Sequence, residues 1–465
     1  MIAGHAEGAH TRGPRLPPAL TWTVTRVAMP RADHLRVVAS ADPCPDADDF
    51  CDRARRHALF TADGPIVVAR APGRFDVLGG IADYSGALVL ELPIAPATLV
   101  AAQATYDGRV TAVSGGRRIT VTATDLLETP LDELARRFAG RDAWAAYVLG
   151  PIALLAREQR LALAGLRLLV SSSVPEGKGV GSSSAVEIAA LQAVVGAFDC
   201  PVEPRRLALL AQRAEQLFAG APCGPMDQMA AACGEAGQLL MLLCRPAEVL
   251  GWLALPTTLT VWGIDSGARH AVPGGPYRRV RCAAFMGKAL LGCRADYLAA
   301  LHPSDVEHER LPEWMTGAEF LRHYDGVEDG VSVVEPDVAY PVRAATLHPI
   351  EEQLRVEMFA DLLRLPVTSR RARLLGELMY ASHASYSRCG LGMRVTDALV
   401  EAVRAAGWEH GLAGARVSGG GSGGTVVVLA HEDAEPVVRE LSERLGAGLV
   451  GGSSPGAAAF GTRVL

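Results

Sequence analysis

Hydrophobic and polar positions follow two different periods along this chain. Between residues 166 and 174, Leu168 and Val170 fall on one side of an extended segment, which is the two-residue period of a strand. Residues 185–198 are apolar on nearly every side and carry Glu187 as their one charge, the pattern of a buried helix. The sequence therefore predicts a strand, a short loop and a buried helix in succession.

The same periodicities predict elements on both sides of this unit. Strands are predicted at residues 66–69, 87–92, 99–113, 118–124, 239–243 and 258–264, and around Ala415 and Thr425. Helices are predicted at residues 46–59, 144–155, 204–217, 277–291, 350–363, 370–387, 394–406 and 434–445.

This order of elements predicts an α+β fold in two lobes. We interpret residues 1–64 as an N-terminal extension, irregular over about the first 30 residues, residues 65–250 as a first domain and residues 251–465 as a second. Residues 302–348 are rich in Pro, Asp and Glu and have a poor periodic pattern, so we interpret them as a long insertion in the second domain.

Composition narrows the classes of partner. The 465 residues are long enough for a large core and two domains. The net charge of −6 comes without a basic cluster, which argues against nucleic acid or a membrane surface and favours small molecules as partners. The nine cysteines include no C-x-x-C pair, and no membrane span or secretion signal is visible. We expect reduced thiols and a cytoplasmic location.

The loop between the predicted strand and helix, residues 175–184, is rich in glycine and serine. Its glycines allow backbone N–H groups to turn toward one point, where the helix N-terminus also favours an anion. An ordinary connection capped by serine is the alternative for such a loop taken alone. Lys178 is followed by Gly, so the loop is not a G-x-x-x-x-G-K-S/T motif. The predicted phosphate-binding residues are Gly177, Gly179, Val180, Gly181, Ser182, Ser183 and Ser184.

Four segments, in order, resemble the GHMP small-molecule kinases. Residues 175–185 resemble their P-x-x-x-G-L/V-G-S-S-A signature, with Ser184 in place of alanine, and residues 70–86 resemble the galactokinase signature P-G-R-V-N-L-I-G-E-H-T-D-Y. Residues 417–428 resemble the third glycine motif, and residues 214–228 the galactokinase segment with a catalytic aspartate. The resemblance covers roughly residues 65–460. It implies the two-lobed GHMP kinase fold, with an N-terminal S5-like domain and a C-terminal ferredoxin-like α/β sandwich.

The resemblance implies ATP as the phosphoryl donor and a sugar hydroxyl as the acceptor. Asp227 stands where the family has its catalytic aspartate, and Arg74 matches the arginine that accompanies it. Without the resemblance, Asp227 would more often be a turn residue and Arg74 a surface ion-pair partner. Ser183 and Glu215 are the implied ligands of Mg²⁺, which suits a few oxygen ligands, although Glu215 alone could equally be a solvated helix residue.

Asp83 and Tyr84 match the family's sugar-contacting pair. A carboxylate can accept hydrogen bonds from two neighbouring sugar hydroxyls. Taken alone, Tyr84 would more often be a core residue. Tyr277 follows a stretch that resembles the galactokinase segment with a further sugar-contacting tyrosine, so it joins the predicted substrate-binding residues.

The chain departs from the galactokinase signature at one place. Gly80 and Ile81 replace a Glu-His pair that serves the C6 hydroxymethyl end of the sugar in that family. A galactose O6 without a partner would cost about 1–3 kcal/mol, whereas a pentose lacks this carbon. We therefore count Gly80 and Ile81 among the substrate-binding residues. The amino-acid sequences of the motifs also resemble those in the kinase part of plant L-arabinokinases.

The sequence thus predicts an ATP- and magnesium-dependent sugar 1-kinase acting on L-arabinose, with D-galactose as the alternative substrate. A non-catalytic sugar and nucleotide sensor is a less favoured alternative, because Arg74, Asp227 and the phosphate loop are all present. A mevalonate-pathway kinase would leave Asp83 and Tyr84 unexplained. The oligomeric state and the role of residues 1–64 stay open.

Overall fold

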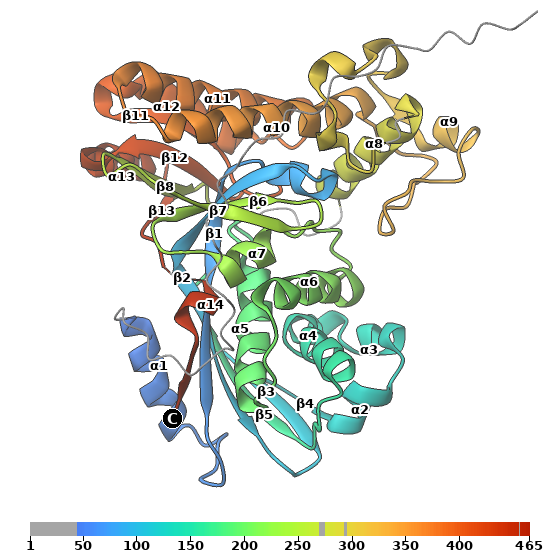
Figure 1. The fold of residues 1–465 in the computed structure, drawn as a ribbon, viewed down its shortest axis with the longest axis vertical. Helices are drawn as coiled ribbons and strands as arrows, with labels where there is room; N and C mark the ends of the chain where they lie inside the picture. Colours follow the sequence, from blue (N-terminus) through green and yellow to red (C-terminus); the bar gives the residue numbers. More distant parts are fainter. Residues whose placement is uncertain (1–43, 269–274, 293–294, 455) are drawn as a thin grey trace, which may run out of the picture. The chain divides into compact units, whose positions relative to one another are not determined.

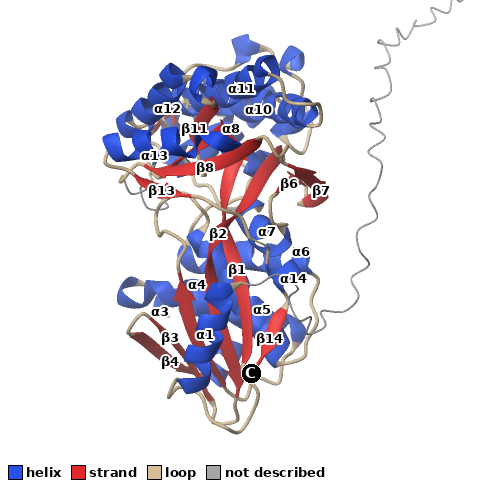
Figure 2. Cartoon of the chain, turned by 90° about the vertical axis from the view of Figure 1, so that its left-hand side faces the viewer, coloured by secondary structure: helices blue, strands red, loops and turns tan. Residues whose placement is uncertain are grey.

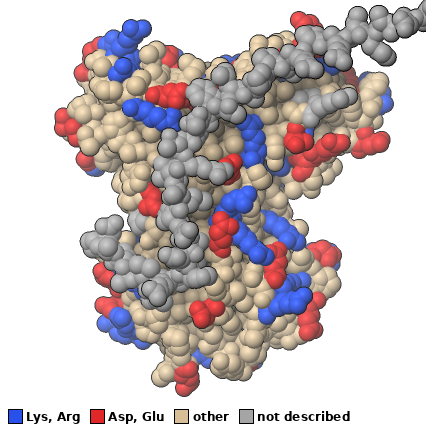
Figure 3. All heavy atoms as spheres, in the orientation of Figure 1, with Lys and Arg blue, Asp and Glu red and all other residues tan. Residues whose placement is uncertain are grey.

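A computed structural model describes residues 44–268, 275–292, 295–454 and 456–465 (Figure 1). The irregular pattern predicted for about the first 30 residues lies outside these ranges. Within them, the chain folds around two main sheets with helices packed against them (Figure 2). On the face drawn in Figure 3, Lys and Arg side chains are interspersed with Asp and Glu. Among the described helices, none has the length and apolar character needed to cross a bilayer.

The first sheet has the strand order β14-β1-β2-β5-β3-β4, and β6 joins it by pairing with β2 and with β7. All of these pairs are antiparallel except β3 with β5. Its strands are β1 (Val67–Leu78), β2 (Leu88–Ala104), β3 (Arg109–Ser114), β4 (Arg117–Thr122), β5 (Leu166–Ser172), β6 (Gln238–Leu243), β7 (Glu248–Ala254) and β14 (Thr462–Val464).

Helices cover this sheet with their apolar sides, some packed directly on the strands and others on neighbouring helices. The largest core lies between the strands and helices α4 to α7, and a smaller one lies under α1. The central helix α5 is an Ala, Val, Leu and Ile helix buried on nearly all sides, as its pattern predicts. The helices of this part are α1 (Pro45–Arg56), α2 (Ala123–Glu128), α3 (Leu131–Arg137), α4 (Ala143–Gln159), α5 (Ser182–Ala197), α6 (Pro204–Ala214), α7 (Met226–Cys233) and α14 (Ala457–Phe460).

The second sheet is antiparallel, with the order β11-β12-β8-β13. One core lies between its strands and helices α11 to α13, and another is shared with β1, β2 and α10. Its strands are β8 (Leu259–Asp265), β11 (Leu412–Val417), β12 (Thr425–His431) and β13 (Gly448–Val450). Its helices are α8 (Pro276–Leu291), α10 (Val342–Leu363), α11 (Ser369–Arg388), α12 (Arg394–Ala406) and α13 (Glu435–Arg444).

Two predictions about elements are wrong for identifiable reasons. The predicted strand 99–113 is two strands, because Gly108 turns the chain with φ 73° and Asp107 accepts a hydrogen bond from the backbone N–H of Arg109. Helix α10 runs through Pro349 instead of beginning after it. The proline removes one backbone donor, and the helix buries residues before and after it against α8 and α11.

The segment predicted as an insertion contains short elements. It holds β9 (Met315–Thr316), α9 (Gly317–Leu321) and β10 (Ala339–Tyr340), and the two strands pair with each other. Several of its apolar side chains pack into a core with α8 and α10. The predicted domain boundary at residue 250 falls inside β7, and the last strand of the chain, β14, pairs with β1 in the first sheet. The division into two domains at this residue stays a prediction.

Candidate active site

A cavity of about 410 Å³ contains most of the residues that the motifs single out. Its lining includes residues of β1, the turn after β1, the loop before α5, the turn before α7, α8 and the glycine-rich loop after β11. Further lining residues come from α4, β3, β4 and β5. The predicted site residues on its wall are Arg74, Asp83, Gly177, Gly179, Gly181, Ser182, Ser183, Glu215, Asp227 and Tyr277. Segments that are far apart in the sequence therefore meet at one cavity.

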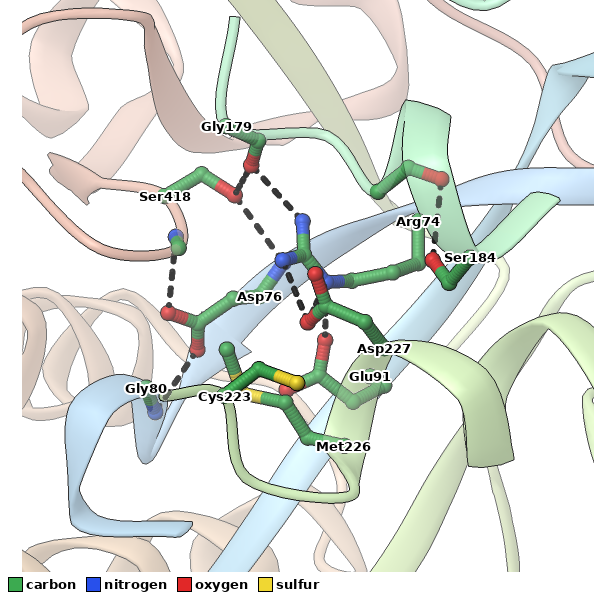
Figure 4. A network of polar contacts seen from close by, with 12 residues as sticks. Arg74, Asp76, Gly80, Glu91, Gly179, Ser184, Cys223, Met226, Asp227 and Ser418 are labelled. Atoms are coloured by element: carbon green, nitrogen blue, oxygen red, sulfur yellow. Dashed lines mark hydrogen bonds and ion pairs between the residues drawn. The ribbon is translucent and has the colours of Figure 1, made fainter. Parts of the chain in front are cut away.

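Arg74 and Asp227 are in direct contact at this cavity (Figure 4). The Nη2 and Nε atoms of Arg74 donate to Oδ1 of Asp227 over 2.6 and 3.0 Å. Glu91 Oε2 lies 3.2 Å from the same Nε, and its carboxyl group is fully buried. Arg74 is held at an irregularity of β1, because the register with β2 shifts between Pro72 and Arg74. The predicted pair is thus brought together, with Glu91 as a further partner.

Burial and neighbouring charges shift the pKa values of both Arg74 and Glu91. Burial disfavours its cation, but the negative charges of Asp227, Glu91 and Asp76 outweigh burial and raise the pKa of Arg74. Burial, with the charge of Asp76, raises the pKa of Glu91 well above its usual range. Arg74 thus stays charged, and its guanidinium faces the cavity beside Asp227.

The loop before α5 presents a helix N-terminus to the cavity. Helix α5 begins at Ser182, and Ser182 and Ser183 both line the cavity. Gly177, Gly179 and Gly181 have φ between 68° and 73°, a conformation that glycine adopts without strain. A 16-residue helix that starts at a cavity favours an anion there.

Side chains and backbone from other motifs hold this loop in place. The carbonyl of Gly179 accepts hydrogen bonds from Arg74 Nη1 (2.7 Å) and Ser418 Oγ (3.1 Å), and the carbonyl of Val180 accepts from the backbone N–H of Arg74. The Ser184 hydroxyl donates to the carbonyl of Gly181. Val180 and Ser184 are buried and are not part of the lining, so they shape the loop from behind.

Glu215 and Ser183, the metal ligands that the resemblance implies, both line the cavity. Gln228 Nε2 donates to Glu215 Oε2 over 2.6 Å and to the buried Glu187 over 3.2 Å. Burial, together with the charge of Asp227, raises the pKa of Glu215 to about 7. The part of the chain that the structure describes has no group of three or more His, Cys, Asp or Glu side chains placed to hold a metal. A hydroxyl and one carboxylate fit Mg²⁺, which takes few protein ligands and fills its shell with water and phosphate oxygens.

Asp83 is also on the cavity wall. Its Oδ1 accepts from the backbone N–H of Tyr84 (2.6 Å), and its carboxyl group packs so closely on Gly224 that a Cβ there would overlap it. Burial, with the charge of Asp227, raises the pKa of Asp83 to about 7, while the nearby Arg281 lowers it. Tyr277 also lines the cavity. The Tyr84 ring lies edge-on to Tyr277, 5.9 Å between centroids, and behind the lining.

Gly80 and Ile81 are not on the wall of the cavity. Both are buried in a short 3₁₀ turn, Gly80–Ser85, between β1 and β2. The backbone N–H of Gly80 donates to Asp76 Oδ1 (3.0 Å), and that of Ile81 donates to the hydroxyl of Tyr386 (2.8 Å). The Ile81 side chain packs in the core that also contains Tyr386 and Leu391.

Sequence reasoning missed the residues that hold the site from behind. Arg281 Nε pairs with the buried Asp329 at 2.9 Å, Nη1 donates to the carbonyl of Pro222, and its guanidinium lies 5.1 Å from the centre of the Tyr84 ring. Asp329 comes from the segment that the sequence predicts as an insertion. No motif contains these residues. Glu91 is different, because a lone charge in the apolar strand β2 could have indicated from the sequence a buried carboxyl group with a charged partner.

Comparisons with known proteins agree with the motifs. Three family profiles match: "GHMP kinases N terminal domain" over residues 146–235, "GHMP kinases C terminal" over residues 358–461, and "Galactokinase galactose-binding signature" over residues 57–104. A crystal structure of Lactococcus lactis galactokinase with galactose has the same fold, with a TM-score of 0.69 at 20% identity over 89% of this chain and 99% of that one. Methanococcus jannaschii mevalonate kinase gives 0.53 at 13% identity, over 83% and 98%.

Curated relatives have higher sequence identity to this chain than these two solved structures do. An L-arabinokinase of Arabidopsis thaliana is 38% identical over 88% of this chain, which spans 48% of the length of that relative. A galactokinase of Chloroflexus aggregans is 32% identical over 79% of this chain and 85% of its own length. With the three profiles and the shared fold, these matches show that the chain belongs to the galactokinase family of the GHMP kinases, a family of sugar kinases.

Proposed function

We propose that this protein transfers the γ-phosphoryl group of ATP to the anomeric hydroxyl of L-arabinose and releases ADP. One observation carries the proposal: the Arg74–Asp227 pair lies in one cavity with the N-terminus of α5 and the carboxyl group of Asp83. A helix end suited to an anion, a carboxylate beside a cation, and a second carboxylate suited to hydroxyl groups therefore surround a single space.

Each of these groups has one role in the proposed phosphoryl transfer. The nucleotide phosphates lie at the glycine loop and the N-terminus of α5, where backbone N–H groups and Ser182 bind the anion. Ser183 and Glu215 would hold Mg²⁺, which supplies positive charge to the phosphate oxygens when bound. Asp227 accepts the proton of the sugar hydroxyl as its oxygen bonds to phosphorus and the bond to ADP breaks. Arg74 offsets the negative charge that accumulates on the transferred group.

The sugar end supports a pentose. Asp83 is the carboxylate that can accept from ring hydroxyls. No polar side chain is available at positions 80 and 81, because Gly80 has none and Ile81 is packed in the core. These two positions lie behind the cavity wall and offer no polar group to it, so a C6 hydroxyl on this side of the cavity would lose water without a partner from them, at a cost of about 1–3 kcal/mol. The similarity to an L-arabinokinase points to the same sugar.

D-Galactose is the second candidate substrate. It is favoured by the match to the galactose-binding signature over residues 57–104 and by galactokinase relatives of which the chain covers 85%. L-Arabinopyranose and D-galactose share their ring hydroxyls, so Asp83 alone does not separate them.

ADP release in a coupled assay tests the proposal. The panel is L-arabinose, D-galactose, D-galacturonate and methyl arabinopyranoside, each with magnesium-ATP. We expect the highest kcat/KM with L-arabinose and no turnover of the methyl glycoside, whose anomeric oxygen carries no proton. A higher kcat/KM with galactose would overturn the proposed substrate. Turnover of the methyl glycoside would overturn the proposed position of transfer, and no turnover of any sugar would overturn the proposed reaction.

A further inference from the structure

We infer that Tyr386 is a specificity-determining residue: it holds from behind the turn Gly80–Ser85, which brings Asp83 to the cavity wall, and thereby limits the cavity to sugars without a C6 group. The inference rests on the proposed function, since it explains the proposed preference for a pentose. It moves the selecting feature from the turn itself to a side chain of helix α11, more than 300 positions along the chain from Gly80.

The space next to Gly80 is already filled. A Cβ atom placed on Gly80 would overlap the hydroxyl of Tyr386 and would lie 2.7 Å from Asp76 Oδ2 and 2.9 Å from Arg416 Nη2. Gly80 also has φ 49°, which residues with a side chain adopt at a cost. A glutamate at this position therefore cannot be accommodated while Tyr386 keeps its place.

Tyr386 has little freedom to move away. It is fully buried, and its hydroxyl accepts from the backbone N–H of Ile81 over 2.8 Å and donates to the carbonyl of Gly419 over 2.9 Å. Its ring lies edge-on to His348, with 5.2 Å between centroids, and the guanidinium of Arg416 lies 5.0 Å from its centre. The two hydrogen bonds connect the 3₁₀ turn Gly80–Ser85 to the glycine-rich loop after β11.

Arg416 and Asp76 fix the other side of the same space (Figure 4 shows Asp76 between Gly80 and the loop of Ser418). Both are fully buried, and Arg416 Nη1 lies 2.7 Å from Asp76 Oδ1. Asp76 Oδ2 accepts from the backbone N–H of Gly419. Breaking such a buried pair costs free energy. Neither Arg416 nor Asp76 can therefore move away from residue 80 without losing its partner.

Tyr386 itself is not on the cavity wall, so it acts through the turn that it supports. With a smaller residue at 386, the turn can recede from the sugar and leave room for a hydroxymethyl group. Discrimination over one such group is commonly worth roughly 10- to 200-fold in kcat/KM. The ratio of kcat/KM for L-arabinose to that for D-galactose should therefore depend on residue 386.

The test compares this ratio in the wild-type protein, Tyr386→Leu, Gly80→Glu and the double variant. Tyr380→Leu is the matched control, because Tyr380 is a buried tyrosine on the same helix that packs in a different core. We expect Tyr386→Leu to lower the arabinose-to-galactose ratio by at least ~10-fold, with the control unchanged. We expect Gly80→Glu alone to lose activity on both sugars and the double variant to recover activity on galactose.

Equal loss on both sugars in Tyr386→Leu would overturn the inference. If Tyr386→Leu does not fold, Tyr386→Phe, which removes only the hydroxyl, replaces it. A lower ratio then supports the inference, and an unchanged ratio overturns it. The proposed function is judged separately on the wild-type protein, since a wild-type preference for galactose refutes the pentose substrate whatever residue 386 does.

Discussion

The two sides of the proposed active site, the phosphoryl side and the sugar side, are built in different ways. On the phosphoryl side, Arg74, Gly179 and Asp227 come from three separate motifs, and Arg74 contacts both of the others directly. On the sugar side, Gly80 and Ile81 belong to a motif, yet their partner Tyr386 comes from none. Both sides start from β1, where Arg74 and Asp76 are two residues apart. A motif thus identifies residues that meet at the reacting groups, but not the residues that set the shape of the pocket behind them.

This difference predicts different consequences of substitution. Changes on the phosphoryl side should act on kcat and on the stability of a dense set of charges. Changes behind the sugar side should act on KM and on the choice of sugar, with a smaller effect on kcat.

The largest effect is expected for Arg74→Met. The arginine is 2% exposed and lies between Asp227 and the fully buried Glu91, so its removal leaves both carboxyl groups without their cation. Breaking a buried pair by removing one partner costs roughly 3–5 kcal/mol. Urea unfolding should show a loss of about that size, together with loss of turnover. A control is Arg136→Met, whose exposed pair with Asp132 should contribute little; equal losses in both variants would contradict this role of Arg74.

Asp227→Asn should reduce kcat by at least ~10²-fold, the low end for removal of a general base. Because asparagine keeps the shape of the aspartate side chain, sugar binding measured by calorimetry should change little. The control is Asp265→Asn, which removes a carboxylate that pairs with Lys178 outside the cavity lining. A variant at position 227 with near-normal kcat would remove this residue from its role.

A smaller effect is expected for Asp329→Asn, behind the sugar side. Loss of the 2.9 Å pair with Arg281 should loosen the contact with the Pro222 carbonyl and the support of Tyr84 and Asp83. Hydrogen bonds to charged groups are worth roughly 1.5–3 kcal/mol, so the KM for sugar should rise about tenfold, with a smaller change in kcat. Glu307→Gln, in an exposed pair with Arg310 of the same segment, should leave KM unchanged. A fall in kcat without a rise in KM would contradict this positioning role.

The last prediction concerns how the stability of the protein depends on pH. Burial raises the pKa of Asp83 to about 7, whereas an unfolded chain has a value of about 3.9. The folded protein then binds this proton more tightly, so the contribution of Asp83 to stability is present below about pH 4 and is lost as the pH rises toward 7. Without ligands, Tm should fall less between pH 5 and pH 8 in Asp83→Asn than in the wild-type protein. Identical slopes in a thermal melt series would contradict the raised pKa.

Sequence reasoning reached the family and the fold, and it named residues that the structure brings together on the wall of one cavity, because short motifs specify backbone conformation. The glycines at 177, 179 and 181 adopt the positive φ that only glycine adopts easily. It did not reach Tyr386 or Arg281, because on an apolar helix the pattern predicts which face is buried but not what that face contacts. It also placed Gly80 and Ile81 in the pocket, whereas packing turns them toward the core. Those contacts depend on how α8 and α11 pack on the turn.

The most direct measurement is a competition in one tube. Equal concentrations of L-arabinose and D-galactose are mixed with limiting magnesium-ATP, and the sugar phosphates are quantified by ³¹P NMR, because the product ratio equals the ratio of the two kcat/KM values. The account predicts an excess of L-arabinose 1-phosphate, with the phosphorus coupled to the anomeric proton. An excess of galactose phosphate, or phosphorus coupled to any other ring position, would contradict it.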